Sequence, residues 1–196
     1  MILRKNLTTL LLVAVITLMG IEIVYLVYQN RQLRQMIDDP SRFFEKTLQA
    51  GQTVPAIRAE DVNGNELALT YSQDGPYTLV LWFSPTCSSC EDNFEFWQDV
   101  HRLSKPEKLR IVGFCACTVG EAKEEITAKQ LGFPVLAATE PTIVDLYKGN
   151  LLPQTILIAP DGLIKSVWPG ALLESKKKDI LSILRDIDTI KPEGGE

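Results

Sequence analysis

The sequence is poor in the residues that build metal centres and disulfide frameworks. Its 196 residues include one histidine and only four cysteines. Four cysteines are too few for a small domain held together by disulfides, so each one must be interpreted from its own surroundings. The net charge is −5, and nucleic-acid partners are not expected because proteins that bind nucleic acid are usually basic. The length fits one ordinary domain with an appendage.

One long apolar run lies near the N-terminus. Residues 7–28 read LTTLLLVAVITLMGIEIVYLVY and contain a single charged side chain, Glu22. At about 1.5 Å per residue, such a helix spans a hydrocarbon core of roughly 30 Å. The run is longer than the apolar part of a cleavable signal peptide, and Tyr25 and Tyr28 suit a membrane interface. We therefore predict an uncleaved anchor that contacts membrane lipid. A lipoprotein is excluded because no cysteine comes directly after the run.

The rest of the chain divides into four further segments. We predict an N-terminal flank at 1–6, a juxtamembrane stalk at 29–50, a folded domain at 51–190 and a flexible tail at 191–196. Basic residues lie on both sides of the apolar run in similar number. The positive-inside rule therefore gives no orientation for the domain.

The folded domain shows strands that alternate with helices. Residues 77–83, YTLVLWF, form a continuous apolar run between two proline-containing turns, which is typical of a central strand buried on both faces. The Asn63-Gly64 pair predicts a hairpin. Further strands are expected at 54–59, 109–117, 133–137, 155–159 and 163–168, and helices at 88–104, 118–132, 141–146 and 174–190. The order predicts an α/β fold with a central mixed sheet flanked by helices.

Two of the cysteines follow the 77–83 strand directly, in the stretch LWFSPTCSSCEDN. Cys87 falls at the N-terminus of the helix expected at 88–104, where unpaired backbone N–H groups favour a negative charge. Such a position lowers the pKa of a thiol and favours the thiolate, which is the form that attacks disulfides. Cys90 lies about one turn further along and is close enough to close a disulfide. The spacing predicts an attacking sulfur and a resolving sulfur.

Three longer segments resemble a known family. FSPTCSSC is similar to the active-site stretch of the methylamine-utilisation accessory thioredoxins. GQTVPAIRAEDVNGNELAL and LLPQTILIAPDGLI look like the opening hairpin and the second signature of the membrane-anchored thiol-disulfide oxidoreductases of the TlpA/ResA type, within the redoxin group. The resemblance covers roughly 51–190 and implies a thioredoxin-like fold. No cofactor and no resident metal are expected.

The resemblance also implies roles for individual residues. Pro153 matches the family's cis-proline, which faces the CxxC pair, and this gives Leu152 and Pro153 a substrate-docking role. Thr86 and Ser88 flank Cys87 and are assigned to the same substrate-binding site. The implied partners are disulfides or dithiols of client proteins outside the cytoplasm, together with a membrane electron donor. By analogy with the family, reduction of the clients is expected rather than oxidation.

The sequence departs from the family at several positions. Thr86 stands where many relatives have Trp, and Asn93 stands where several carry a Glu that titrates near the cysteines. Leu81 replaces the buried Asp of thioredoxins. The usual proton-handling carboxylate is therefore missing from both places. Glu91 and Asp92 could substitute for it, or they could be solvated acids that favour the helix N-terminus.

The other two cysteines, Cys115 and Cys117, are expected at i and i+2 of the strand at 109–117, which would place them on one face. They form either a second redox pair that relays electrons from Cys87 and Cys90, or two small buried residues, since free cysteine is often buried. The sequence leaves both interpretations open.

Other uses of the cysteines remain as alternatives. A metal site could combine all four, and His101 is the only other soft ligand. A purely structural Cys87–Cys90 disulfide would close too short a loop to constrain the unfolded chain. A thiol peroxidase, or a copper or zinc carrier on the same fold, would be a different function. Their motifs need spacings that Cys87 and Cys90 do not have. His101 could also shuttle protons, or it could be a residue at the surface or at the boundary between surface and core.

Overall fold

The computed structural model describes the backbone of residues 2–38 and 47–189. The expected tail at 191–196 and most of the second half of the expected stalk lie outside the described residues. The chain separates into two compact units, Met1–Phe43 and Phe44–Glu196, and each is described by itself.

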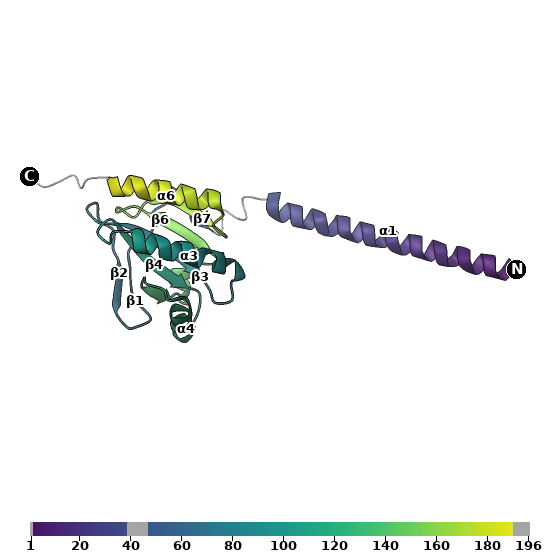
Figure 1. Cartoon of the computed structure of the whole chain (residues 1–196), viewed down its shortest axis with the longest axis horizontal. Helices are drawn as coiled ribbons and strands as arrows, with labels where there is room; N and C mark the ends of the chain where they lie inside the picture. Colours follow the sequence, from purple (N-terminus) through teal and green to yellow (C-terminus); the bar gives the residue numbers. More distant parts are fainter. Residues whose placement is uncertain (1, 39–46, 190–196) are drawn as a thin grey trace, which may run out of the picture. The chain divides into compact units, whose positions relative to one another are not determined.

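The first unit contains a single described element, helix α1 (Ile2–Asp38), which is drawn in purple in Figure 1. The helix continues through the predicted boundary between anchor and stalk at residue 28. Its stretch Val13–Arg31 is long and apolar enough to cross a membrane, with a mean hydropathy of 1.5, and its described side chains are exposed. The helix is therefore a candidate membrane span.

The second unit contains the predicted alternation of strands and helices. Its elements are β1 (Ile57–Glu60), β2 (Glu66–Leu69), β3 (Tyr77–Phe83), α3 (Ser88–Leu103), β4 (Leu109–Cys115), α4 (Val119–Lys129), β5 (Val135–Ala137), α5 (Pro141–Leu146), β6 (Gln154–Ile158), β7 (Ile164–Pro169) and α6 (Glu174–Thr189).

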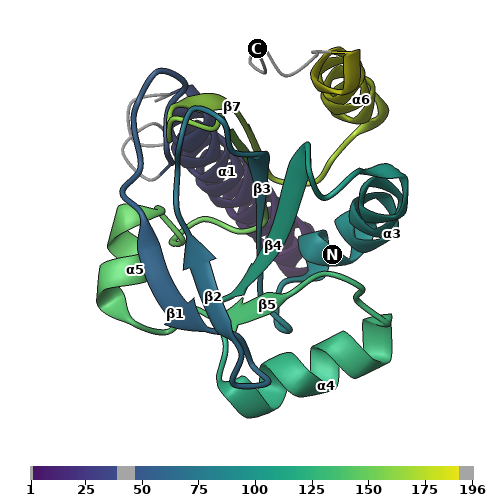
Figure 2. The same cartoon turned by 90° about the vertical axis from the view of Figure 1, so that its left-hand side faces the viewer.

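Five strands form one mixed sheet in the order β5-β4-β3-β6-β7. Strands β3, β4 and β5 are parallel, whereas β6 is antiparallel to both β3 and β7. Figure 2 shows α3 and α6 on one side of this sheet, and α5 with the β1–β2 hairpin on the other side. The predicted α/β fold with a mixed sheet flanked by helices is confirmed.

Two apolar clusters fill the two sides of the sheet. Strand β3 is buried along almost its whole length, so its alternate side chains enter different clusters. Phe83 packs with Phe94 and Trp97 of α3, whereas Trp82 packs with Phe114 and Tyr147 on the opposite side. Leu79, Leu81 and Phe83 face α3 and α6, and Val80 and Trp82 face α5. This burial on both faces explains the uninterrupted apolar run of the sequence.

Three details differ from the expectation. Strand β4 ends at Cys115, so Cys117 lies in a bend after the strand rather than within it. Helix α4 ends earlier than expected, because Gln130 adopts a left-handed backbone conformation (φ 54°) that stops it. Helix α3 ends at Leu103, one residue before the expected bound at 104, and the side chain of this last residue is 74% exposed.

Candidate functional site

The loop between β3 and α3 carries the first cysteine pair. Its backbone turns after Phe83, and the N–H of Cys87 donates to the carbonyl of Ser84 at 3.0 Å. The hydroxyls of Ser84 and Thr86 lie 3.0 Å apart, and the N–H of Thr86 donates to the Ser84 hydroxyl at 3.3 Å. These bonds hold the short loop in one conformation and place Cys87 directly before the helix.

Cys87 is the N-cap residue of α3, with extended backbone angles (φ −95°, ψ 96°). Within the described part of the chain, its side chain makes no capping hydrogen bond, so the first N–H groups of the helix retain their positive end charge beside the sulfur. Cys87 and Cys90 form a disulfide with Cα atoms 5.4 Å apart. Cys87 is partly exposed and Cys90 is fully buried, so only one sulfur of the pair is open to a large partner.

The proline-led segment lies at the same edge of the sheet as the cysteine pair. Strand β6 begins at Gln154, which pairs with Trp82 near the end of the antiparallel strand β3. The peptide bond between Leu152 and Pro153 is cis. Leu152 packs against the cluster that contains Cys90. The fold therefore brings Leu152 and Pro153 to the end of the sheet where Cys87 lies, while Thr86 and Ser88 lie exposed on either side of Cys87.

Leu81 and Asn93, the two positions at which the resemblance implies a carboxylate, have other uses here. Leu81 is fully buried in the cluster beneath α3. Asn93 is also fully buried (0% exposed), and its amide oxygen accepts from the N–H of Leu172 at 2.7 Å. Its amide nitrogen lies 3.4 Å from the carbonyl of Gly170. Asn93 therefore joins α3 to the loop between β7 and α6, which is a role that an ionised Glu could not fill in the same way.

Glu91, in the first turn of α3, and the next residue, Asp92, lie at the surface. Glu91 contacts the ammonium of Lys129, which is the last residue of α4. The hydrogen bond that the ammonium donates to the Glu91 carboxylate raises the pKa of Lys129. Asp92 is exposed. Both side chains match the interpretation of solvated acids at a helix N-terminus, and Glu91 also links α3 to α4.

The second cysteine pair lies at the end of the neighbouring strand. Cys115 and Cys117 form a disulfide with Cα atoms 5.2 Å apart. Both side chains are buried, Cys115 fully and Cys117 with 6% exposed. The expectation that they share a face assumed one straight strand. The bend after Cys115 removes that premise, yet both side chains belong to the cluster beneath α3.

The single histidine lies at the opposite end of α3 from Cys87 and Cys90. His101 is in the last turn of α3, eleven residues after Cys90, which corresponds to roughly 16 Å along a helix. Its ring packs edge-on against Phe133. Among the residues that the structure describes, no group of three His, Cys, Asp or Glu side chains could hold a metal ion. A site that combines the four cysteines with His101 is therefore not formed.

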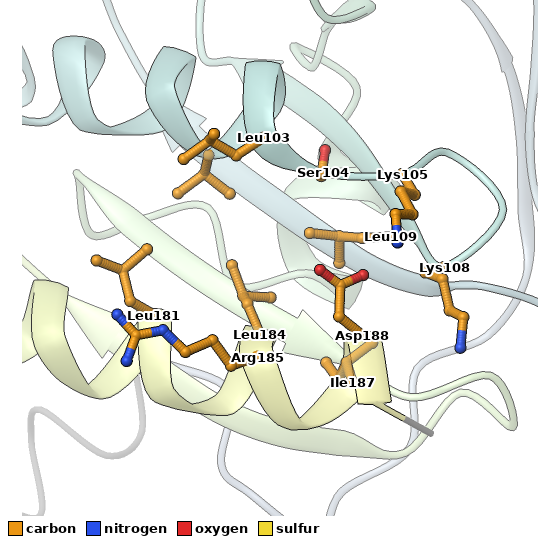
Figure 3. Close-up of a pocket in the computed structure, with 11 residues that line it drawn as sticks. Leu103, Ser104, Lys105, Lys108, Leu109, Leu181, Leu184, Arg185, Ile187 and Asp188 are labelled. Atoms are coloured by element: carbon orange, nitrogen blue, oxygen red, sulfur yellow. The ribbon is translucent and has the colours of Figure 1, made fainter. Parts of the chain in front are cut away.

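A pocket of about 240 Å³ lies at the other end of α3. Figure 3 shows Leu103, Leu181 and Leu184 around it, with Lys105 and Asp188 near its rim. It is formed by the end of α3, the start of β4 and helix α6. The cysteines lie at the opposite edge of the sheet, where β3 and β4 end. This pocket is consequently not part of the candidate redox site.

Two contributors to the site were not predicted from the sequence. Asn93 was noted only as a departure, and no sequence signal points to its partners in the 170–172 loop. Thr118 and Glu121 form a capping box at the start of α4, directly after Cys117. The pattern Thr-x-x-Glu is the known signal for this motif and could have identified it.

The chain is similar to several known proteins. A sequence model of the AhpC/TSA family matches residues 50–167. The chain is 28% identical over 155 residues to the thiol-disulfide oxidoreductase ResA of Geobacillus kaustophilus, covering 76% of this chain and 83% of that protein. It is 26% identical over 149 residues to ResA of Bacillus subtilis, covering 74% of this chain and 81% of that protein. The thioredoxin domain of a thiol-disulfide oxidoreductase from Bacteroides vulgatus has a TM-score of 0.60 and 20% identity, covering 70% of this chain and 99% of that one.

Proposed function

The chain belongs to the AhpC/TSA family, whose model matches more than half of it, and from this premise we propose that it is a thiol-disulfide oxidoreductase in which Cys87 attacks and Cys90 resolves. The observation that carries the proposal is the disulfide between a partly exposed cysteine at the uncapped start of α3 and a buried cysteine one turn later. Relatives that match about three quarters of the chain are named thiol-disulfide oxidoreductases, and the shared thioredoxin fold supports the same assignment.

The reaction begins with the dithiol form of the pair. The Cys87 thiolate, favoured by the positive end of α3, attacks one sulfur of the client disulfide. A mixed disulfide between Cys87 and the client forms, and the other client sulfur leaves as a thiolate that takes up a proton. Cys90 then loses its proton and attacks the Cys87 sulfur, which closes the Cys87–Cys90 bond and releases the second client thiol. Two electrons and two protons pass to the client.

Residues around the pair would hold the client during exchange. Leu152 and Pro153 lie at the same edge of the sheet as Cys87, and an extended client segment placed there could pair with backbone groups before β6. Thr86 and Ser88 are exposed beside Cys87 and would line the approach of the client to the sulfur. Their hydroxyls suit hydrogen bonds to a peptide backbone.

The location of the domain completes the proposal. Helix α1 contains a candidate span, and it would tether the domain to a membrane through residues 7–28. A dithiol pair that reduces protein disulfides is most useful where such bonds form, on the outer side of the membrane. The clients would then be disulfides or dithiols of proteins outside the cytoplasm, and a membrane electron donor would return the pair to its dithiol form.

The two alternative functions receive less support. In a thiol peroxidase the reactive sulfur needs a Pro and a Thr or Ser at fixed distances before it. Pro85 and Thr86 lie too close to Cys87 for that pattern, and Cys90 is fully buried. A metal carrier would need ligands beyond the pair, and the described residues form no such group.

The test is the turnover of an insulin disulfide by the purified chain in the presence of a chemical dithiol. The variant Cys87→Ser should lose this turnover, and the matched variant Ser89→Ala, which changes an exposed neighbour in the same motif, should retain it. Equal turnover in wild type and Cys87→Ser would refute the proposal. A Cys90→Ala variant should accumulate the mixed disulfide between Cys87 and its client, which identifies the client directly.

A further inference from the structure

We propose that Cys115 and Cys117 form a second redox pair that exchanges electrons with Cys87 and Cys90 inside the protein. The inference rests on the proposed function and adds to it an internal store for two further electrons. All four cysteines of the chain take part.

The two pairs lie at the same edge and on the same face of the sheet. Strands β3 and β4 are parallel neighbours, so their carboxyl ends meet at one edge, and Phe83 pairs with Cys115 in register. The N–H of Ala116 donates to the carbonyl of Phe83 at 2.8 Å. Residues paired in parallel strands point to one face, and the Phe83 ring packs against Phe94 of α3.

Side-chain packing gives the same placement independently. Cys90, Cys115 and Cys117 belong to a single buried cluster beneath α3, and Cys87 packs against that cluster. The opposite face of the sheet has its own cluster, which contains none of the four. The four cysteines therefore all belong to, or pack against, one apolar cluster, and they lie where β3 and β4 end.

A structural role does not account for the second disulfide. The stabilisation that a disulfide gives through the unfolded chain grows with the length of the loop that it closes. Cys115 and Cys117 are two residues apart, so their disulfide closes a very short loop. It therefore removes little conformational freedom from the unfolded chain. The bond is better explained as the oxidised form of a redox pair, which can accept two electrons.

The second pair is built to react within the protein rather than with a client. Cys117 precedes α4, as Cys87 precedes α3, but here Thr118 caps the helix and accepts from the N–H of Glu121. The Glu121 carboxylate in turn accepts from the N–H and the hydroxyl of Thr118, both at 2.8 Å. The end charge of α4 is thus already compensated, and both sulfurs are buried. A client protein therefore cannot reach the sulfurs of Cys115 and Cys117, and the end of α4 does not stabilise a thiolate there.

The exchange step is balanced without an external reagent. When Cys87 and Cys90 are thiols and the second pair is a disulfide, a thiolate of the first pair attacks a sulfur of the Cys115–Cys117 bond. A mixed disulfide between the pairs forms, and one thiol of the second pair is released. The remaining thiol of the first pair then closes the Cys87–Cys90 bond and frees the other. Two electrons and two protons move from the first pair to the second, and the step is reversible.

The experiment follows each pair separately in the full-length protein. The oxidised chain is treated with dithiothreitol under native conditions, and free thiols are alkylated at timed intervals. The masses of the tryptic peptides are then measured by mass spectrometry. Four basic residues between Cys90 and Cys115 (Arg102, Lys105, Lys108 and Arg110) separate the two pairs into different peptides. Wild type is compared with Cys87→Ala/Cys90→Ala and with Cys115→Ala/Cys117→Ala, where alanine suits the buried apolar site.

The expected result has three parts. Both pairs of wild type become thiols, whereas in Cys87→Ala/Cys90→Ala the second pair is reduced at least tenfold more slowly. Fully reduced wild type then releases four molecules of glutathione per chain when mixed with oxidised glutathione. The variant Cys115→Ala/Cys117→Ala releases two.

Contrary results separate this inference from the proposed function. If the second pair stays a disulfide while Cys87 and Cys90 cycle, the second pair is structural and only this inference falls. The same holds if its reduction is equally fast with and without the first pair. If Cys87 and Cys90 do not react at all, both proposals fall. The alkylation pattern of unmodified wild type decides the first point even if the alanine variants fail to fold.

Discussion

The β3–α3 junction and the β4–α4 junction each place a cysteine pair at the same edge of the sheet. They differ in the residue that occupies the N-cap of the helix that follows. At the first junction the cysteine itself occupies the N-cap and makes no capping bond within the described residues, so the helix end faces sulfur. At the second junction Thr118 occupies the N-cap and Cys117 is one residue further out. The first sulfur is partly exposed and the second is buried.

The comparison separates two requirements of a redox cysteine. A sulfur that meets clients needs access and a stabilised thiolate, and the uncapped end of α3 supplies both to Cys87. A sulfur that exchanges only within the protein needs neither, but it needs to lie in or against the same apolar cluster. The same strand–helix connection can therefore serve either use, depending on which residue caps the helix.

The largest effect is expected from removing the resolving sulfur. In Cys90→Ala, Cys87 still attacks, but the mixed disulfide cannot be resolved at the normal rate, so steady-state insulin turnover should fall about 100-fold or more. Covalent adducts of Cys87 should accumulate in non-reducing gels. Turnover within a factor of two of wild type would show that Cys90 is not the resolving residue and would remove the contrast between the junctions.

A smaller effect is expected from the residue that anchors α3. Asn93→Ala removes two hydrogen bonds to the 170–172 loop and leaves the buried N–H of Leu172 without its acceptor. The free energy of unfolding should fall by about 1–3 kcal/mol, measured by urea denaturation. The neighbouring exposed variant Asp92→Ala should change it by less than about 0.5 kcal/mol. Equal stability of the two variants would contradict the anchoring role of Asn93.

Uncapping the second helix tests the comparison from the other side. Thr118→Ala should lower the free energy of unfolding by about 1 kcal/mol and should speed alkylation of Cys117 in the reduced protein, because the helix end then faces sulfur. Thr127→Ala, an exposed change within the same helix, serves as the control. If alkylation of Cys117 is unchanged while stability falls, the cap has a structural role only.

The smallest effect concerns the other half of the capping box. Hydrogen bonds from the backbone and the hydroxyl of Thr118 lower the pKa of Glu121 below its ordinary value of 4.5. A carboxylate whose pKa is lower in the folded state than in the unfolded state adds stability at pH values above its unfolded-state pKa. This contribution disappears as the pH falls through its folded-state pKa. The stability difference between wild type and Glu121→Gln should therefore be constant near neutral pH and should shrink below about pH 4.5. A difference that grows on acidification would be the opposite of this expectation.

The sequence predicted most of the fold because its strong signals are local. The apolar run at 77–83 and the Asn63-Gly64 turn correspond closely to β3 and to the β1–β2 hairpin. The position of Cys87 before a helix also follows from the local pattern. In contrast, the role of Asn93 depends on a loop 77 or more residues away, and no local pattern encodes that contact.

The second cysteine pair also depends on structure that local sequence patterns do not encode. The spacing of Cys115 and Cys117 suggested one straight strand, but the end of β4 is set by its partners, since β5 pairs only as far as Cys115. The chain then bends into the cap of α4. That bend, rather than strand periodicity, brings the two residues together, and a reading based on alternation could not anticipate it.

The most direct test of the account is the pH dependence of alkylation in the fully reduced protein, with each cysteine followed by mass spectrometry. The account predicts that iodoacetamide modifies Cys87 first, with a midpoint below the value of about 8.5 for free cysteine, while Cys90, Cys115 and Cys117 are still unmodified. A midpoint for Cys87 at or above that of free cysteine, or earlier modification of any of the other three, would contradict it.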